Sequence, residues 1–249
     1  MSRDERALGR PRLTDAGVPR ALAAGEMEIL GLLPGASNAT LLARCVADGD
    51  DVLAVYKPRR GETPLWDFPD GTLHRREVAA YVTACALGWP NVPPTVLRDG
   101  PAGPGSAQLF VEADPSAHFF TLEREHGVTF RRVALFDLVV NNADRKAGHC
   151  LLGADGTIWL IDHGVCFSDE PKLRTVIWGY VGEAFPPEAV GDLRRLEGDL
   201  TEGGPVRREL EALLAVEEVE AMGARLEAML RLGAFPEPGP GRPFPWPPI

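Results

Sequence analysis

The stretch that decides the fold runs from residue 136 to residue 167 and reads FDLVVNNADRKAGHCLLGADGTIWLIDHGVCF. It starts at the end of an apolar helical run, continues as a polar loop, and then predicts two short strands joined by a turn. Asp144 lies in the loop, and Asp162 follows the second strand. We therefore expect the loop and the hairpin to deliver two carboxylates to one place.

Two such carboxylates suit the transfer of a phosphoryl group. This reaction needs a carboxylate that orients or deprotonates the acceptor hydroxyl, and ligands for the metal ion that holds the phosphates. Asp144 fits the first role, and Asp162 fits the second because carboxylate oxygens are good ligands for Mg²⁺. Lys146 would neutralise charge on the moving group. His149 stands where kinases usually carry a metal-binding Asn.

The segments NNADRKAGHCLL and WLIDHGVCF resemble the catalytic and metal-binding loops of the phosphatidylinositol 3- and 4-kinase superfamily. They are most similar to the type II 4-kinases and their bacterial relatives, including an actinobacterial phosphatidylinositol-kinase-like group. The pattern there is N-x-D-R-x-x-x-N followed by I-D-x-G. The match implies catalytic roles for Asp144 and Arg145, and metal binding by Asp162 and, at the position of the Asn, by His149. His149 departs from the Asn of the pattern, and imidazole suits Mn²⁺ better than Mg²⁺.

The resemblance implies an α+β, two-lobed protein-kinase-like fold with a small antiparallel β-rich N-lobe and a mainly helical C-lobe. The N-lobe is expected over residues 25–114 and the C-lobe over residues 115–234. Residues 1–24 mix charges with Gly and Pro and predict a mobile tail with at most one short helix. Residues 235–249 are dense in Pro and predict an extended, mobile tail that would suit an aromatic-lined partner.

Three antiparallel strands are predicted in the N-lobe, near residues 26–33, 39–47 and 52–57. The first turn contains Gly35, Ser37 and Asn38, whose backbone N–H groups and small side chains would cover nucleotide phosphates. An ordinary hairpin turn is the alternative. The sequence contains neither G-x-G-x-x-G nor a Walker A motif.

Lys57 ends the strand LAVYK, which resembles the kinase strand whose Lys holds the nucleotide phosphates. Glu77 lies in a helix predicted over residues 73–89 and would fix the ammonium of Lys57 by pairing with it. The alternatives are an exposed strand-end Lys and a surface Glu. A later strand, predicted near residues 107–112, leads into an expected hinge where Glu112 to Asp114 would offer backbone groups to adenine.

The larger lobe is predicted from its helical patterns. A helix over residues 128–142 carries Asp137, which either braces the catalytic loop through hydrogen bonds or is exposed. Residues 168–186 occupy the position of an activation or substrate loop, and a short helix follows Pro187. Residues 206–233 form a long amphipathic region that predicts helical cover for this lobe.

Composition narrows the class of protein. A net charge of −10 disfavours nonspecific binding to nucleic acid or to an anionic membrane. The N-terminus lacks an apolar signal region, and no apolar run is long enough to span a bilayer. The cysteines are widely spaced without a C-x-x-C pair and are interpreted as reduced thiols. These features predict a cytoplasmic protein without a transmembrane segment.

The leading interpretation is an ATP-dependent phosphotransferase that uses Mg²⁺ or Mn²⁺ and phosphorylates a hydroxyl of a lipid, a protein or a small molecule. The resemblance suggests a phosphoinositide, but the chain lacks the cysteine-rich palmitoylation stretch of type II 4-kinases, and HipA-like kinases with this loop pattern phosphorylate proteins. A nucleotide-binding pseudokinase is the second interpretation, motivated by His149. The third is a zinc protein that uses His149, Cys150, His163 and Cys166. Adjacent residues of a strand point to opposite faces, which opposes the zinc interpretation.

Overall fold

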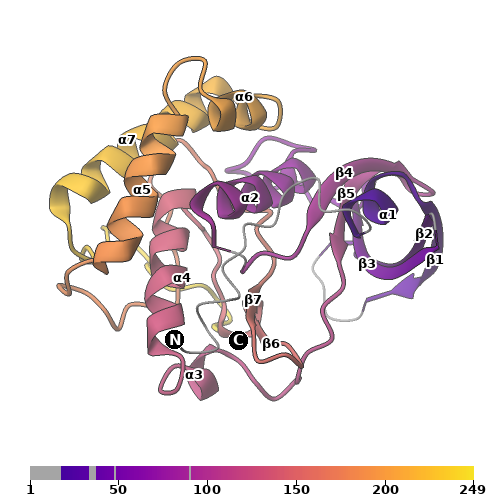
Figure 1. The fold of residues 1–249 in the computed structure, drawn as a ribbon, viewed down its shortest axis with the longest axis horizontal. Coiled ribbons are helices and arrows are strands. Elements are labelled where there is room, and N and C mark those ends of the chain that lie inside the picture. The colour runs from indigo at the N-terminus through magenta and orange to yellow at the C-terminus, as the bar shows by residue number, and fades with distance from the viewer. Residues whose placement is uncertain (1–17, 34–37, 48, 90) are drawn as a thin grey trace.

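The computed structural model describes residues 18–33, 38–47, 49–89 and 91–249. A five-stranded antiparallel sheet lies to one side of a mostly helical part (Figure 1). The order of strands across the sheet is β1-β2-β3-β5-β4. The strands are β1 (Glu26–Leu32), β2 (Leu41–Ala47), β3 (Asp50–Pro58), β4 (Thr95–Gly100) and β5 (Gly103–Leu109).

Tight turns and alternating side chains build this sheet. In the β4–β5 hairpin Gly100 pairs with Gly103, which has a φ of 97°, a conformation that a residue with a Cβ adopts only with strain. Along β2 and β3 every second residue faces a small separate core. The buried side chains on this face include Ala43, Cys45, Ala54 and Tyr56.

Helix α1 (Val18–Ala24) fills the concave side of the sheet (Figure 1). Its Ala21 and Leu22 are completely buried in the core of the sheet. The guanidinium of Arg98 donates to the carbonyl oxygens of Leu22 and Gly25, at 2.8 and 2.9 Å. The end of the expected mobile tail is thus an ordered helix, because two apolar side chains and one arginine attach it to the sheet. Residues 1–17 lie outside the described residues.

We expect Leu22→Ala to lower the free energy of unfolding by about 2–5 kcal/mol, because it leaves a cavity beneath the sheet. Denaturation by urea would measure the change. The matched control is Leu32→Ala, because Leu32 is 71% exposed and its truncation should change stability by less than about 0.5 kcal/mol. Equal effects of the two substitutions would contradict the packing of α1 against the sheet.

Helices form most of the second part of the chain. They are α2 (Leu73–Leu87), α3 (Phe119–Leu122), α4 (Gly127–Val140), α5 (Pro187–Asp199), α6 (Pro205–Glu211) and α7 (Val216–Leu232). A two-stranded hairpin, β6 (Cys150–Leu152) and β7 (Ile158–Leu160), follows α4. The amphipathic region predicted over residues 206–233 is two helices, α6 and α7. The second one begins where the Glu218 carboxylate accepts the Ala215 N–H, at 3.0 Å.

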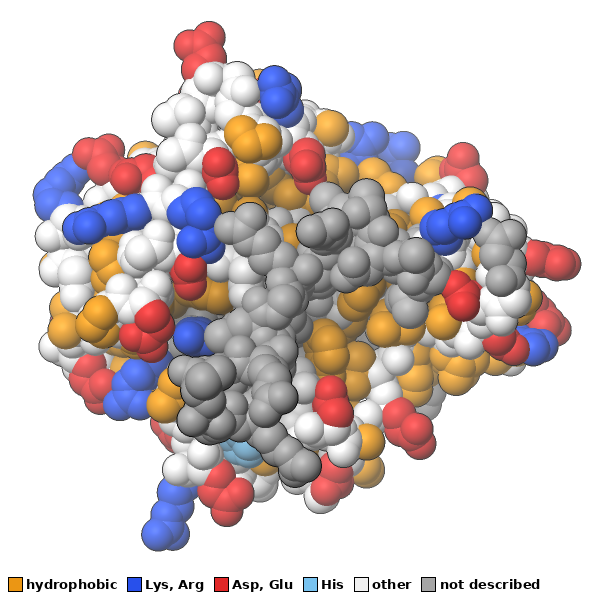
Figure 2. All heavy atoms as spheres, viewed as in Figure 1, with side chains coloured by type: hydrophobic (Ala, Val, Ile, Leu, Met, Phe, Trp, Pro, Cys, Tyr) orange, Lys and Arg blue, Asp and Glu red, His pale blue; other side chains and the backbone are white. Residues whose placement is uncertain are grey.

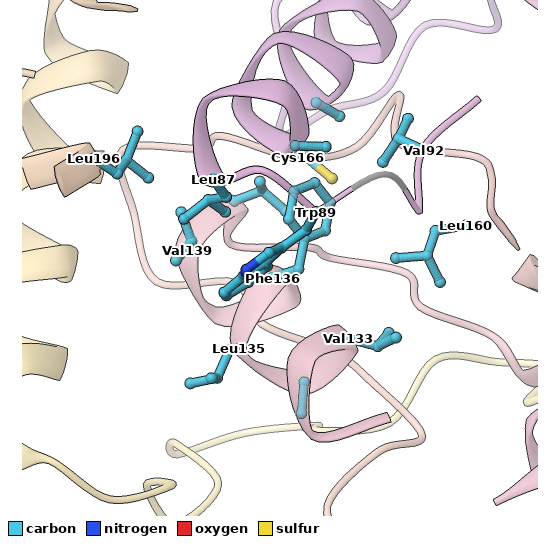
Figure 3. Packing of buried hydrophobic residues seen from close by; sticks show 14 of the residues in the cluster. Leu87, Trp89, Val92, Val133, Leu135, Phe136, Val139, Leu160, Cys166 and Leu196 are labelled. Atoms are coloured by element: carbon cyan, nitrogen blue, oxygen red, sulfur yellow. The ribbon is translucent and has the colours of Figure 1, made fainter. Parts of the chain in front are cut away.

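The main core lies where α2, α4 and the segment after β7 meet (Figure 3). Phe136 of α4 and Trp89, just beyond α2, are almost completely buried there. Cys150 and Cys166 belong to the same core. Helix α4 ends at Asn141, which has a φ of 51°, and Asn tolerates this left-handed conformation better than most residues. The packed core therefore holds both ends of the loop that carries Asp144.

The predicted fold class is confirmed: an antiparallel sheet and a mainly helical lobe are present, and the hairpin at residues 150–160 has formed. Acidic and basic side chains are interspersed on the face shown in Figure 2. Among the described residues, no helix combines the length and the apolar character needed to cross a bilayer.

Residues 235–249 were predicted to be mobile, but Phe235 is buried and the Pro243 carbonyl accepts hydrogen bonds.

Candidate active site

Lys57 is the central cation of the site. It lies near the end of β3 and its ammonium contacts the carboxylate of Glu77 on α2. The same ammonium lies 3.0 Å from Oδ1 of Asp162, which follows β7. The second oxygen of Glu77 accepts the backbone N–H of His163 at 3.0 Å. Glu77 therefore connects the sheet to the segment that carries Asp162.

The charges in this group support one another. Burial lowers the pKa of Lys57, but the carboxylates of Asp162 and Glu77 outweigh it, so its pKa lies above the ordinary value. The charge of Lys57 in turn holds the pKa of Asp162 well below its usual range. Glu77 is 2% exposed, whereas the side chain of Asp162 is 50% exposed. An ionised carboxylate is thus presented to solvent in front of a buried ion pair.

The backbone at Asp162 has a φ of 63°, a left-handed conformation that few residues other than Gly adopt. The next residue, His163, is completely buried, and its Nε2 lies 2.8 Å from the guanidinium of Arg145. Because arginine only donates, Nε2 must be the acceptor in this hydrogen bond. Burial lowers the pKa of His163 well below its ordinary value, in agreement with a neutral ring.

Asp137 and Arg145 form a completely buried ion pair beneath the catalytic loop. The Arg145 Nε donates to both carboxylate oxygens of Asp137, at 3.0 and 3.1 Å. The guanidinium also donates to the carbonyl oxygens of His149 and Ile161, at 3.3 and 3.0 Å. Of the two alternatives for Asp137, the bracing position is the one observed. Arg145, grouped above with the catalytic residues, is 0% exposed and holds the loop from behind.

A hydrogen bond from the backbone N–H of Asp144 fixes the position of this residue in the loop. Its N–H donates to the Asn142 side chain at 3.0 Å, and the amide group of Asn142 donates to Asp137 at 3.0 Å. The ammonium of Lys146 lies 3.0 Å from the Asp144 carboxylate. Burial raises the pKa of Asp144 in spite of this neighbouring cation. A carboxylate with a raised pKa is a better proton acceptor than an ordinary aspartate.

His149 lies between the two aspartates along the chain, and its Nε2 lies 3.4 Å from Oδ2 of Asp162. Burial lowers the pKa of His149 to about 4, which keeps its ring neutral. Its Nδ1 accepts the N–H of Lys146 over a long 3.4 Å contact. This contact places the ring proton on Nε2, so His149 binds a metal through Nε2 only if the contact is given up.

A Mg²⁺ or Mn²⁺ ion fits the donor groups of Asp162 and His149. The carboxylate of Asp162 is ionised and half exposed, and the neutral imidazole of His149 stands beside it. Mg²⁺ in phosphotransfer sites is commonly bound by one or two carboxylates together with substrate phosphates. Among the described residues, no group of three His, Cys, Asp or Glu is arranged as a complete metal site. Phosphate oxygens of a nucleotide would supply further ligands to such an ion.

The zinc interpretation is wrong: His149, Cys150, His163 and Cys166, all of them described residues, contain no group of three that could hold a metal ion. Cys150 and Cys166 are completely buried among apolar side chains. Burial raises the pKa of Cys150 to about 12, so its thiol keeps its proton at neutral pH.

The connection between β3 and α2 reaches the catalytic loop. Phe68 and Leu65 pack with Ala143, the residue before Asp144, in a small separate cluster. Trp66, in contrast, is 93% exposed. A cavity of about 490 Å³ lies on this connection and reaches the β4–β5 turn. Asn38, expected to cover phosphates, accepts the Thr63 N–H at 2.9 Å, and Gly35 and Ser37 lie outside the described residues.

The expected hinge lies between β5 and α3. Glu112 is exposed there, and the N–H of Asp114 donates to the Leu152 carbonyl at 3.2 Å. The Asp114 carboxylate accepts the N–H and the hydroxyl of Ser116. The hinge is therefore attached to the β6–β7 hairpin, and the N–H of Asp114 is not available to adenine.

Sequence reasoning missed a second buried ion pair, between Arg76 of α2 and Glu218 of α7. Arg76 is 1% exposed, lies 2.5 Å from Glu218, and donates to the Cys166 carbonyl at 2.6 Å. Arg76 directly precedes Glu77, whose carboxylate accepts the His163 N–H. These two neighbouring side chains of α2 therefore both bind the backbone of the segment after Asp162. The available signal was an Arg inside a predominantly apolar predicted helix, because a charge that is buried there needs a partner.

Sequence comparison shows which known proteins the chain is similar to. No family model matches it. It is 39% identical to protein Rv2133c of Mycobacterium tuberculosis over 91% of this chain and 93% of that one. It is 32% identical to phosphatidylinositol 4-kinase gamma 4 of Oryza sativa over 61% of this chain, and spans 34% of that protein.

Solved structures show the fold. A Golgi casein kinase with Mn/ADP bound aligns with a TM-score of 0.58 and 14% identity, over 85% of this chain and 73% of that one. The Helicobacter pylori proinflammatory kinase CtkA aligns with a TM-score of 0.53 and 12% identity, over 86% and 94%. The chain therefore has a protein-kinase-like fold and belongs to the family of protein Rv2133c of Mycobacterium tuberculosis.

Proposed function

We propose that this chain is an ATP-dependent phosphotransferase. One observation carries the proposal: two loops, strand β3 and helix α2 bring Asp144, Asp162 and the Lys57–Glu77 pair together. Such an arrangement provides a base, a metal-binding carboxylate and a phosphate-binding cation, which are the groups that phosphoryl transfer needs. Similarity to kinases in fold, and to plant phosphatidylinositol 4-kinases in sequence, agrees with this assignment.

In the proposed reaction Lys57 orients the triphosphate, and Glu77 keeps its ammonium in place. Asp162, with His149, would hold Mg²⁺ or Mn²⁺ against the phosphates. When bound, this ion would neutralise the charge that develops on the phosphate oxygens. An acceptor hydroxyl forms a bond to the γ-phosphorus and gives its proton to Asp144, while the bond to the β–γ bridging oxygen breaks and ADP leaves. Lys146 stabilises the transferring group.

The acceptor is proposed as the hydroxyl of a lipid, a protein or a small molecule. A phosphoinositide is favoured by the sequence similarity to the plant phosphatidylinositol 4-kinases, which covers a third of their length. A protein is favoured by the likeness in fold to a casein kinase.

A nucleotide-binding protein without transfer activity is the second candidate. The observation that favours it is His149, whose Nδ1 accepts a backbone N–H, so that its Nε2 carries the proton. If His149 provides no metal ligand, the nucleotide would bind through Lys57 without a metal ion to position its γ-phosphate.

Thermal melting with ATP tests both candidates. A ligand at about 100 times its dissociation constant stabilises a protein by about 2.7 kcal/mol, which is about 5–10 °C for a chain of this size. We expect such a rise with ATP plus Mg²⁺ or Mn²⁺, and its loss in Asp162→Ala. The matched control is Asp155→Ala in the exposed β6–β7 turn, which should keep the rise.

A rise that needs no metal would favour the protein without transfer activity. If ATP produced no rise at any metal concentration, the proposal of a nucleotide site would be refuted.

A further inference from the structure

The last residues of the chain lie against the catalytic loop. The Pro243 carbonyl accepts the backbone N–H of Thr175 at 3.0 Å and the indole N–H of Trp178 at 3.2 Å. Further on, the Pro248 carbonyl accepts the N–H of Ala147 at 2.8 Å. The C-terminus therefore lies close to hairpin β6–β7, where Figure 1 marks it. We call residues 242–249 the docked tail.

The two segments that bind the docked tail also flank Asp144. Ala147 directly follows Lys146, whose ammonium lies 3.0 Å from the Asp144 carboxylate. On the other side, Thr175 directly follows Arg174, whose charge acts on the pKa of Asp144. Thr175 also pairs with Arg145 in a parallel bridge. The docked tail thus crosses the surface next to the proposed base.

The docked tail is bound through its backbone carbonyl oxygens. Pro245 is buried, whereas the residues on each side of it, Phe244 and Trp246, are 49% and 74% exposed. The tail is thus anchored by the buried side chain of Pro245. The surface beneath it, which we call the docking surface, supplies N–H donors, and the tail supplies carbonyl oxygens, which any polypeptide has. Prolines fit well because they bring no N–H that would be left unpaired.

The docked tail cannot itself accept a phosphate, because residues 234–249 contain no Ser, Thr or Tyr. We propose that the docking surface also binds a polypeptide acceptor that carries a hydroxyl, and that the tail competes with this acceptor. Docking of the acceptor does not depend on the proposed phosphotransfer. Transfer of phosphate to the acceptor hydroxyl does rest on the proposed function: the hydroxyl oxygen bonds to the γ-phosphorus, the bond to the β–γ bridging oxygen breaks, and the proton passes to Asp144.

The test uses the full chain and a fluorescein-labelled peptide of sequence RPFPWPPI, which copies the docked tail. Pro245→Asp puts a charge at a buried position and should release the tail. Since a tethered occupant acts at about millimolar effective concentration, we expect this variant to bind the peptide at least about tenfold more tightly than the unmodified chain. The matched control is Pro240→Asp. Pro240 is exposed and lies outside the docked tail, so this variant should bind the peptide as the unmodified chain does.

A chain ending at Gly241 should bind the peptide as Pro245→Asp does. Equal binding by all forms, or no binding by either released form while it still melts cooperatively, would overturn the proposal. Fluorescence anisotropy measures the binding without any nucleotide. It therefore separates this proposal from the proposed function, which thermal melting with ATP tests.

The acceptor role is tested with the peptide RPFPSPPI and labelled ATP. We expect Pro245→Asp to phosphorylate the serine of this peptide at least about tenfold faster than the unmodified chain, because the docking surface is released. Peptide binding without transfer, in a variant whose melting still responds to ATP, would overturn the assignment of the docking surface to an acceptor.

Discussion

Replacement of Arg145 by methionine is expected to lower the free energy of unfolding by about 3–5 kcal/mol. The substitution leaves Asp137 charged, with no exposed surface and without its cationic partner. It also removes the donors to the His149 and Ile161 carbonyl oxygens and to the His163 ring. For a chain with a total stability of about 5–15 kcal/mol, this is a large share.

Chemical denaturation followed by circular dichroism would measure this loss. The matched control is Arg231→Met, because Arg231 and Glu227 form an i,i+4 pair with side chains 72% and 65% exposed. That pair should contribute at most about 0.5 kcal/mol. The double variant Arg145→Met, Asp137→Asn should recover part of the loss, since it removes the buried charge that the single variant leaves. A single-variant loss below about 1 kcal/mol would contradict this account of the pair.

Asp144→Asn is expected to lower the rate of phosphate transfer by about 10²–10⁴ while nucleotide binding is kept. The asparagine has nearly the same shape and keeps the backbone hydrogen bond to Asn142, but it cannot accept the proton of the acceptor hydroxyl. The raised pKa of Asp144 makes this loss larger than for an ordinary exposed aspartate, because proton transfer to it is more favourable.

The measurement is the release or transfer of labelled phosphate from ATP, with Mg²⁺ and with Mn²⁺. Asp155→Asn makes the same change of charge in the exposed β6–β7 turn and should leave the rate unchanged. An unchanged rate in Asp144→Asn would contradict the assignment of the base. Nucleotide binding with no phosphate transfer in the unmodified chain would favour the protein without transfer activity.

The local elements could be predicted from the sequence alone. Alternation of apolar residues predicted the strands, and helical periodicity predicted α2 and α4 within a few residues of their observed bounds. The order of elements, with Asp144 in a loop and Asp162 after a hairpin, also follows from short-range signals. These signals work because turns, periodicity and helix ends depend on neighbouring residues.

Tertiary structure decided which polar side chains meet. From the sequence, Asp137 was equally compatible with an exposed helical position, and its burial with Arg145 depends on packing of the whole core. Arg76 and Glu218 lie in helices far apart along the chain, so no local pattern connects them.

The two ends of the chain show the same difference between what the local sequence predicts and what the tertiary structure decides. Charged residues, Gly and Pro predicted mobile ends, but α1 fills the concave side of the sheet and the docked tail is bound beside Asp144. In both cases the order comes from surfaces that distant segments build, here the sheet and the two segments that flank Asp144. A sequence pattern records the local preference of a segment, and the contacts that the rest of the fold offers to that segment determine whether it is ordered.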